Sequence, residues 1–204
     1  MKSPTFLRRA FGPGALVLTL AVAACSGGGH SPVHSGAGAA TSASASASPG
    51  AVFNDADAAF AEHMSVHHQQ AIVMSALAAE RAADPRVKEL AAKIESAQSP
   101  EIATMTAWLS AWGLPPAETG DGHGAGHESM PGMMSAADMT KLAESTGQAF
   151  DDQFLTMMIA HHEGAVTMAR AQIADGANPE AKALAAKIIT GQQAEIAAMK
   201  AMSR

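Results

Sequence analysis

An internal repeat constrains this chain more than any other feature. A segment around His67-His68 returns around His161-His162, and the matching residues keep an offset of 94 positions. The shared residues are a phenylalanine, two methionines, the histidine pair and an alanine: Phe60, Met64, His67, His68, Ala71 and Met74 in one copy, and Phe154, Met158, His161, His162, Ala165 and Met168 in the other. Each copy should be one supersecondary unit, so two equivalent halves should form the fold.

Each half is predicted to be a helical hairpin. At about 100° per residue the repeated phenylalanine, methionines and first histidine share one helical stripe. Helix-start residues are Asn54 or Asp55, Asp84 followed by Pro85, and Asn178 followed by Pro179. We therefore expect long helices over about 55–82, 84–112, 149–174 and 179 to the C-terminus, with a short helix from Ser135 to about Ser145. With no alternating strand pattern, these spans predict an all-α fold, a four-helix bundle of two duplicated hairpins.

The N-terminal part is predicted to be a leader followed by a tether. Residues 1–24 carry basic residues before an apolar run that is too short to span a membrane as a mature helix, which is typical of a signal peptide. The run ends in Val22-Ala23-Ala24-Cys25, which resembles a bacterial lipobox and implies lipidation of Cys25, the only cysteine. Residues 25–51 should be a flexible Gly, Ser and Ala tether. The domain should then span 52–204, with repeats over 52–113 and 149–204 and a connector over 114–148.

The side chains on the repeated stripe suggest a soft metal. Thioether sulfur and imidazole nitrogen together suit copper, with Cu(I) favoured and Cu(II) possible, better than zinc or a hard cation. The candidate ligands are the histidines and methionines of the two copies: His67, His68, Met64, Met74, His161, His162, Met158 and Met168. The alternative reading is a packing seam, since methionine is a common filler of apolar cores. Whether His67 and His161 share one site or belong to two is open at this stage.

Two further groups could serve the same metal. Carboxylates on or beside the apolar stripes could orient the imidazoles or supply oxygen ligands: Asp57, Glu101, Asp151 and Glu195. For the two glutamates we expect a contact with an imidazole, because an unpaired carboxylate facing the seam would be costly. The connector holds His123, His127, Met130, Met133 and Met134 in a Gly-rich run. It is either a mobile loop that captures metal or a simple spacer.

These residues also resemble a known family. The segment from Phe150 to Met168, together with Met130-Pro-Gly-Met133, is similar to the DUF305 family. The resemblance covers about Val52 to Met202. It implies a ferritin-like helical bundle in an extracytoplasmic, often lipid-anchored protein, with a role in copper binding or tolerance. The first repeat matches less closely, because His63 and Gln69 stand where the second repeat has Met157 and Glu163.

The sequence thus predicts a copper-binding protein at the cell surface that acts as a metal buffer, chaperone or tolerance factor and exchanges copper with an unknown partner. An enzyme is not expected, because no Ser, Cys or Lys lies in a recognisable catalytic setting. Nucleic acid is disfavoured by a formal net charge of −6, to which the leader contributes positively. The alternatives are a ferritin-like di-iron or di-manganese oxidase, although neither repeat has a Glu-x-x-His motif, and a structural adaptor with a Met-rich core.

Overall fold

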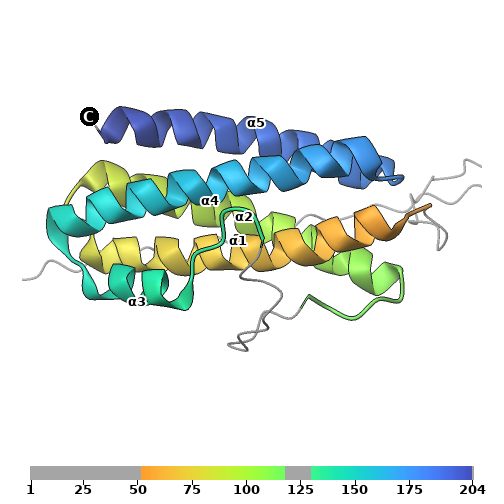
Figure 1. Ribbon diagram of the computed structural model, residues 1–204, viewed down its shortest axis with the longest axis horizontal. Coiled ribbons are helices and arrows are strands. Elements are labelled where there is room, and N and C mark those ends of the chain that lie inside the picture. Colours follow the sequence, from red (N-terminus) through yellow and green to blue (C-terminus); the bar gives the residue numbers. More distant parts are fainter. Residues whose placement is uncertain (1–51, 118–129, 204) are drawn as a thin grey trace, which may run out of the picture. The chain divides into compact units, whose positions relative to one another are not determined.

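The computed structural model describes residues 52–117 and 130–203. Within these ranges the chain forms five helices: α1 (Asp55–Arg81), α2 (Pro85–Ala111), α3 (Ala136–Glu144), α4 (Gly147–Asp175) and α5 (Pro179–Met202). The described residues contain no strand, only an isolated bridge between Ala82 and Gly147. The predicted all-α fold is confirmed (Figure 1). None of these helices is both long and apolar enough to cross a membrane.

The helix starts follow the predicted capping signals. Asn54 caps α1 and Ser135 caps α3, each in a reciprocal capping box with the acidic residue three positions later. Asp84 and Asn178 cap α2 and α5, and each is followed by a proline at the first helical position. The start of α4 is different: Thr146 makes no side-chain capping bond, and the helix begins at Gly147, slightly earlier than expected.

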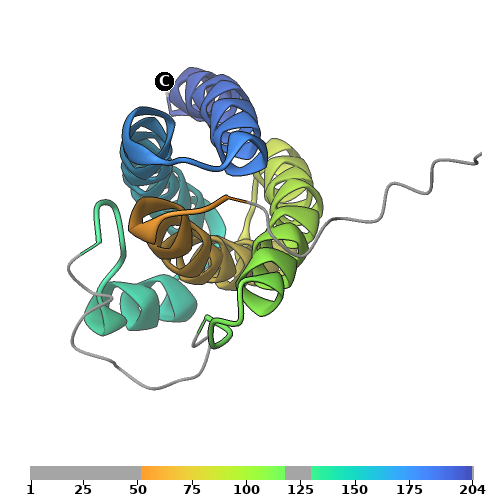
Figure 2. The same ribbon diagram turned by 90° about the vertical axis from the view of Figure 1, so that its right-hand side faces the viewer.

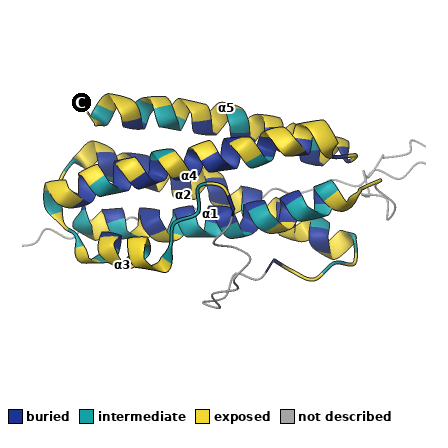
Figure 3. Cartoon of the chain, in the orientation of Figure 1, coloured by how far each residue is buried: buried dark blue, intermediate teal, exposed yellow. Residues whose placement is uncertain are grey.

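The four long helices form two hairpins packed on each other. α1 pairs with α2, α4 pairs with α5, and the hairpins meet where α1 packs on α4. Viewed along the bundle, α2 and α5 lie on the opposite side from α1 and α4, and α3 lies outside α1 and α4 (Figure 2). Buried residues face inward along each helix, and exposed ones cover the outside (Figure 3).

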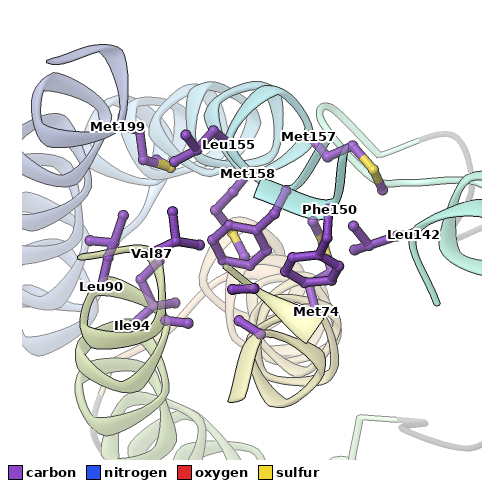
Figure 4. Packing of buried hydrophobic residues seen from close by; sticks show 14 of the residues in the cluster. Met74, Val87, Leu90, Ile94, Leu142, Phe150, Leu155, Met157, Met158 and Met199 are labelled. Carbon is purple, nitrogen blue, oxygen red and sulfur yellow. The ribbon is translucent and has the colours of Figure 1, made fainter. Parts of the chain in front are cut away.

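The core consists of two hydrophobic clusters along the bundle. One contains Met74, Ile94, Leu142, Phe150 and Met158 and lies beside α3 (Figure 4). The other contains Phe60, Met64, Met105 and Ile188. Along α1, His67 and His68 come after Met64 and before Met74. The histidines therefore occupy a polar layer between the two apolar clusters.

Two aspartates join the hairpins to each other. Asp151, on α4, accepts hydrogen bonds from the backbone N–H groups of Ala83 and Asp84 at 3.1 and 2.8 Å, in the turn between α1 and α2. Asp57, on α1, accepts from the backbone N–H groups of Ala177 and Asn178 at 2.9 and 3.0 Å, in the turn between α4 and α5. The two sets correspond at the repeat offset. Each hairpin thus forms hydrogen bonds to the turn of the other hairpin.

Candidate metal centre

Two histidine rings, one from each repeat, lie against each other at the centre of the bundle. The ring centroids of His67 and His161 are 3.7 Å apart, with an angle of 35° between the ring planes. Both side chains are fully buried, as are those of His68 and His162. The repeat therefore brings its four histidines into one central layer, where α1 packs on α4.

Glutamates from α2 and α5 contact the second histidine of each pair. His68 Nε2 lies 3.0 Å from Glu101 Oε2, and His162 Nε2 lies 2.8 Å from Glu195 Oε2. These are the contacts that the sequence led us to expect. Because a carboxylate accepts, each imidazole donates from Nε2–H and keeps its lone pair on Nδ1. This arrangement orients the rings as a carboxylate orients a metal-binding histidine.

A loop in the connector forms a hydrogen bond with His67. His67 Nε2 donates to the carbonyl oxygen of Pro131 at 3.0 Å. Gly132, whose φ is +79°, lies against the backbone of α4. On the other side of this contact, a Cβ at Gly164 would overlap the carbonyl of Pro131. Gln70 fixes the end of the loop, since its side chain donates to the carbonyl of Met134 at 2.9 Å and accepts from its N–H at 2.8 Å. The lack of a side chain on Gly164 thus lets the loop approach α4.

Several imidazole nitrogens in this layer have no hydrogen-bond partner in the described part of the chain. They are Nδ1 of His67, His68 and His162, and both ring nitrogens of His161. Buried polar atoms are nearly always paired, and leaving one unpaired costs about 1–3 kcal/mol. A neutral imidazole nitrogen with a free lone pair is also the form that ligates a metal. These nitrogens are therefore the candidate ligands of this layer.

Burial keeps the imidazoles of His67, His68 and His161 neutral. Burial, reinforced by the neighbouring His68, lowers the pKa of His67 from 6.5 to about 3. Burial also lowers the pKa of His161 well below its ordinary value, and the nearby His67 adds to this effect. The pKa of His68 falls for the same reason, although Glu101 partly opposes the change. Near neutral pH these three rings are already unprotonated, so binding a metal ion would not require them to release a proton first.

The predicted methionine ligands lie on either side of the histidine layer. Met64, Met74 and Met158 are fully buried, and Met168 is partly buried. Met64 and Met168 belong to one apolar cluster, and Met74 and Met158 belong to the other. Met64 and Met168 also line a surface hollow of about 230 Å³ between α1 and α4, together with His63. Of these two methionines only Met168 is partly exposed, since Met64 is fully buried.

The remaining predicted residues are distributed differently. Met130 is buried, and Met133 and Met134 are partly buried in the loop that contacts α1 and α4. His123, His127 and Cys25 lie outside the described residues. Asp57 and Asp151 bond the helix turns described above, and each lies ten residues, about 15 Å of helix, from His67 or His161 on its own helix.

Gln70, Pro131 and Gly164 were not identified from the sequence. The mid-helix glycine was the one local sign of a close approach, since glycine lowers helix stability by about 1 kcal/mol and so indicates a packing requirement. Among the described residues, no group of three or more His, Cys, Asp or Glu side chains is placed to hold a metal ion.

The fold and this layer define a class of protein: all-α proteins of two duplicated hairpins with paired, buried histidines between them. A family model described as "Domain of unknown function (DUF305)" matches residues 57–203, and the chain belongs to this family. No curated protein matches it.

Several solved structures are similar to this chain. A DUF305 protein from Streptomyces coelicolor shares 38% identity over 71% of this chain and 89% of its own, with a TM-score of 0.62. A DUF305 fragment from Deinococcus radiodurans shares 34% identity over 74% and 96%, with a TM-score of 0.66. CopM in its Cu(II)-bound form shares 34% identity over 72% and 95%, with a TM-score of 0.60. CopM has also been crystallised in Cu(I)-bound and Ag-bound forms.

Proposed function

We propose that this protein binds copper as Cu(I) in the histidine layer between α1 and α4, and that it acts as a metal buffer, chaperone or tolerance protein rather than an enzyme. The leader and Cys25 would place it outside the cytoplasm, held to the membrane by a lipid anchor. Copper here is cargo, to be received from and passed to partner proteins.

The contact between His67 and His161 is the observation that carries this proposal. Two neutral imidazoles, 3.7 Å apart between ring centroids, have three nitrogens without hydrogen-bond partners in the described structure. They come from different repeats, so they would form one central site rather than two separate ones. Cu(I) accepts few ligands and prefers soft ones, and a bare imidazole nitrogen with nearby thioethers provides such a set.

The methionines would complete the coordination. Met64 precedes His67 by three residues and Met158 precedes His161 by three, so each thioether lies one helical turn from an imidazole on the same stripe. The similarity to CopM, which has been crystallised with Cu(I), Cu(II) and Ag, supports this choice of metal. The loop at Met130 to Met134 contacts His67 through Pro131, and its Met133 and Met134 are partly exposed, so it could deliver metal to the layer.

A ferritin-like oxidase is a weaker candidate. Glu101 and Glu195 do contact His68 and His162, as carboxylates contact imidazoles in such enzymes. Each glutamate contacts the histidine through Nε2, however, and so orients the ring rather than standing beside it as a fellow ligand. A purely structural role for the Met-rich core is the third possibility, and the same experiment separates it from the other two.

The test is a competition titration of the purified protein against a Cu(I) chelator, with Ag(I) as a redox-inert soft cation in parallel. Replacing His67, His68, His161 and His162 together with alanine should abolish tight binding. A more conservative variant, Met64→Leu with Met158→Leu, should weaken it, because leucine fills similar volume without a sulfur. The matched control is Met105→Leu with Met199→Leu, which changes two buried methionines of α2 and α5 outside the predicted set.

If the paired methionine variants bind Cu(I) equally, thioethers are not ligands. If the histidine variant keeps the affinity of the unmodified protein while remaining helical, the histidine layer is only a packing feature and the proposal is wrong.

A further inference from the structure

The face opposite the α1–α4 contact contains a groove that lies outside the proposed copper ligands, although two glutamates in its lining also orient His68 and His162. It lies between α2 and α5, on the side where Figure 2 shows these helices next to each other, and has a volume of about 480 Å³. Its polar lining consists of Gln98 and Glu101 from α2, and of Lys187, Thr190, Gln192 and Glu195 from α5. Gln98 and Gln192 correspond at the repeat offset, as do Glu101 and Glu195, so the groove has the symmetry of the duplication.

The two glutamine amides in this groove are buried and have no hydrogen-bond partner among the described residues. Gln98 is 2% exposed and Gln192 is 4% exposed. Neither the amide nitrogen nor the amide oxygen of either side chain has a hydrogen-bond partner in the described part of the chain. Four unpaired amide atoms in one groove are costly, because a buried polar group normally needs a partner. Apolar side chains would fill these positions at lower cost, so the amides point to a ligand.

The glutamates give this groove its charge. Each contacts an imidazole through Oε2, and Glu101 Oε1 forms an ion pair with Lys187 Nζ at 3.3 Å. Lys187 is 70% exposed, so it reaches into the groove from solvent. Its counterpart in the first repeat, Lys93, instead pairs with Glu89 on its own helix at 2.8 Å. A cationic group therefore already occupies one side of the groove, on one carboxylate only.

We propose that this groove is a second cation site, separate from the histidine and methionine ligands. It would take a divalent cation that prefers oxygen ligands, held by the carboxylate oxygens of Glu101 and Glu195 and the amide oxygens of Gln98 and Gln192. The ammonium group of Lys187 takes the place of that cation when it is absent. Two carboxylates against one ammonium leave a net negative charge that excludes anions. Oxygen donors are poor ligands for Cu(I), so this site and the copper site select different ions.

Mn²⁺ is the probe for this site, because it prefers oxygen ligands and broadens the NMR signals of nearby amides. Titrated into the purified, isotopically labelled protein, it should give saturable broadening centred on residues 97–101 of α2 and 190–195 of α5. Weak or non-saturable broadening, or a centre elsewhere on the bundle, would overturn the proposal and leave the groove as a place for buried water.

Lys187→Met tests the role of the lysine. Removing a competing ammonium that forms an exposed ion pair should tighten Mn²⁺ binding about two- to fivefold. Lys93→Met is the matched control: it removes the same charge at the corresponding position of the other repeat and should leave the affinity closer to that of the unmodified protein. Equal effects of the two variants would show that only net charge matters and would refute the role assigned to Lys187.

Gln98→Leu with Gln192→Leu tests the amides. The protein should stay folded, since leucine replaces unpaired buried polar groups, and Mn²⁺ binding should fall at least about tenfold. Unchanged Mn²⁺ binding in the folded variant would overturn the proposed ligand set. An Ag(I) titration of the same samples keeps the two sites distinct. Silver binding with no manganese binding would refute only this inference, and the reverse would refute only the copper proposal.

Discussion

Replacing His161 with leucine should make the metal-free protein more stable and remove its tight Cu(I) binding. His161 is fully buried, and neither ring nitrogen has a hydrogen-bond partner among the described residues. An unsatisfied buried polar group costs about 1–3 kcal/mol, whereas an apolar side chain of similar volume costs less than about 1.5 kcal/mol through its change of shape. The difference predicts a gain of about 1 kcal/mol in the free energy of unfolding at pH 7.5.

The same substitution should reduce the sensitivity of the protein to acid. Burial lowers the pKa of His161 and His67 in the folded state, so below pH 6.5 the unfolded chain binds protons that the folded chain excludes. The stability is therefore complete above about pH 6.5 and declines as the pH falls toward the depressed pKa values. The slope is about 1.4 kcal/mol per pH unit for each such histidine. Without His161 the slope should decrease by that amount.

Urea denaturation followed by circular dichroism at pH 7.5 and pH 5.5 measures both effects. His161→Gln is the matched variant, because it removes the titrating ring and retains an unpaired buried polar group. It should show the reduced acid sensitivity without the gain in stability at pH 7.5. The reasoning is refuted if His161→Leu is less stable than the unmodified protein at pH 7.5, or if the difference in stability between the two pH values is unchanged.

Three further variants test other contacts. Gly164→Ala places a Cβ against the carbonyl of Pro131, so it should displace the loop and lower stability by about 1–3 kcal/mol, measured by thermal unfolding. Asp57→Asn removes the charge that receives the N–H groups of the α4–α5 turn and should cost about 1–3 kcal/mol, measured by urea unfolding. Burial raises the pKa of Asp57, but its hydrogen bonds outweigh this and leave it below 3.8, so the unmodified protein should lose this contribution only as the pH falls below that value. Glu101→Gln with Glu195→Gln should weaken Cu(I) binding about 10–100-fold in chelator competition while the bundle stays folded, because the imidazoles lose the groups that orient them.

Local signals in the sequence were sufficient to predict the helices and their pairing. Capping side chains and prolines mark a helix start through bonds within three residues, so Asn54, Asp84, Ser135 and Asn178 could be identified without knowledge of the fold. The duplication supplied the rest, since two copies of one hairpin must bury the same stripe. The contacts of Glu101 and Glu195 with imidazoles followed from that stripe and from the cost of an unpaired buried carboxylate.

Positions along the bundle axis could not be predicted in the same way. Asp57 and His67 share a helical face, so the sequence predicts that both side chains point the same way from the helix axis. It does not predict what each side chain meets at its own position along the bundle. Their separation of about 15 Å along α1 brings Asp57 to the turn of the other hairpin instead of to the histidines. The contact between Pro131 and His67 joins residues 64 positions apart through an irregular loop, where helical periodicity gives no information. Only the tertiary structure brings such residues together.

The loop also makes two equivalent histidines different. His67 and His161 occupy the same position in the two repeats and lie together at the centre of the bundle. The loop of Met130 to Met134 has no counterpart among the described residues of the first repeat, and its carbonyl at Pro131 accepts from Nε2 of His67. Both ring nitrogens of His161 lack a hydrogen-bond partner among the described residues. An incoming soft cation would therefore meet one imidazole already fixed in orientation, with a single nitrogen left to bind, and one that can present either nitrogen. In the proposed copper site the duplication would supply the paired ligands, and the loop between the copies would set which of them can adjust to the metal.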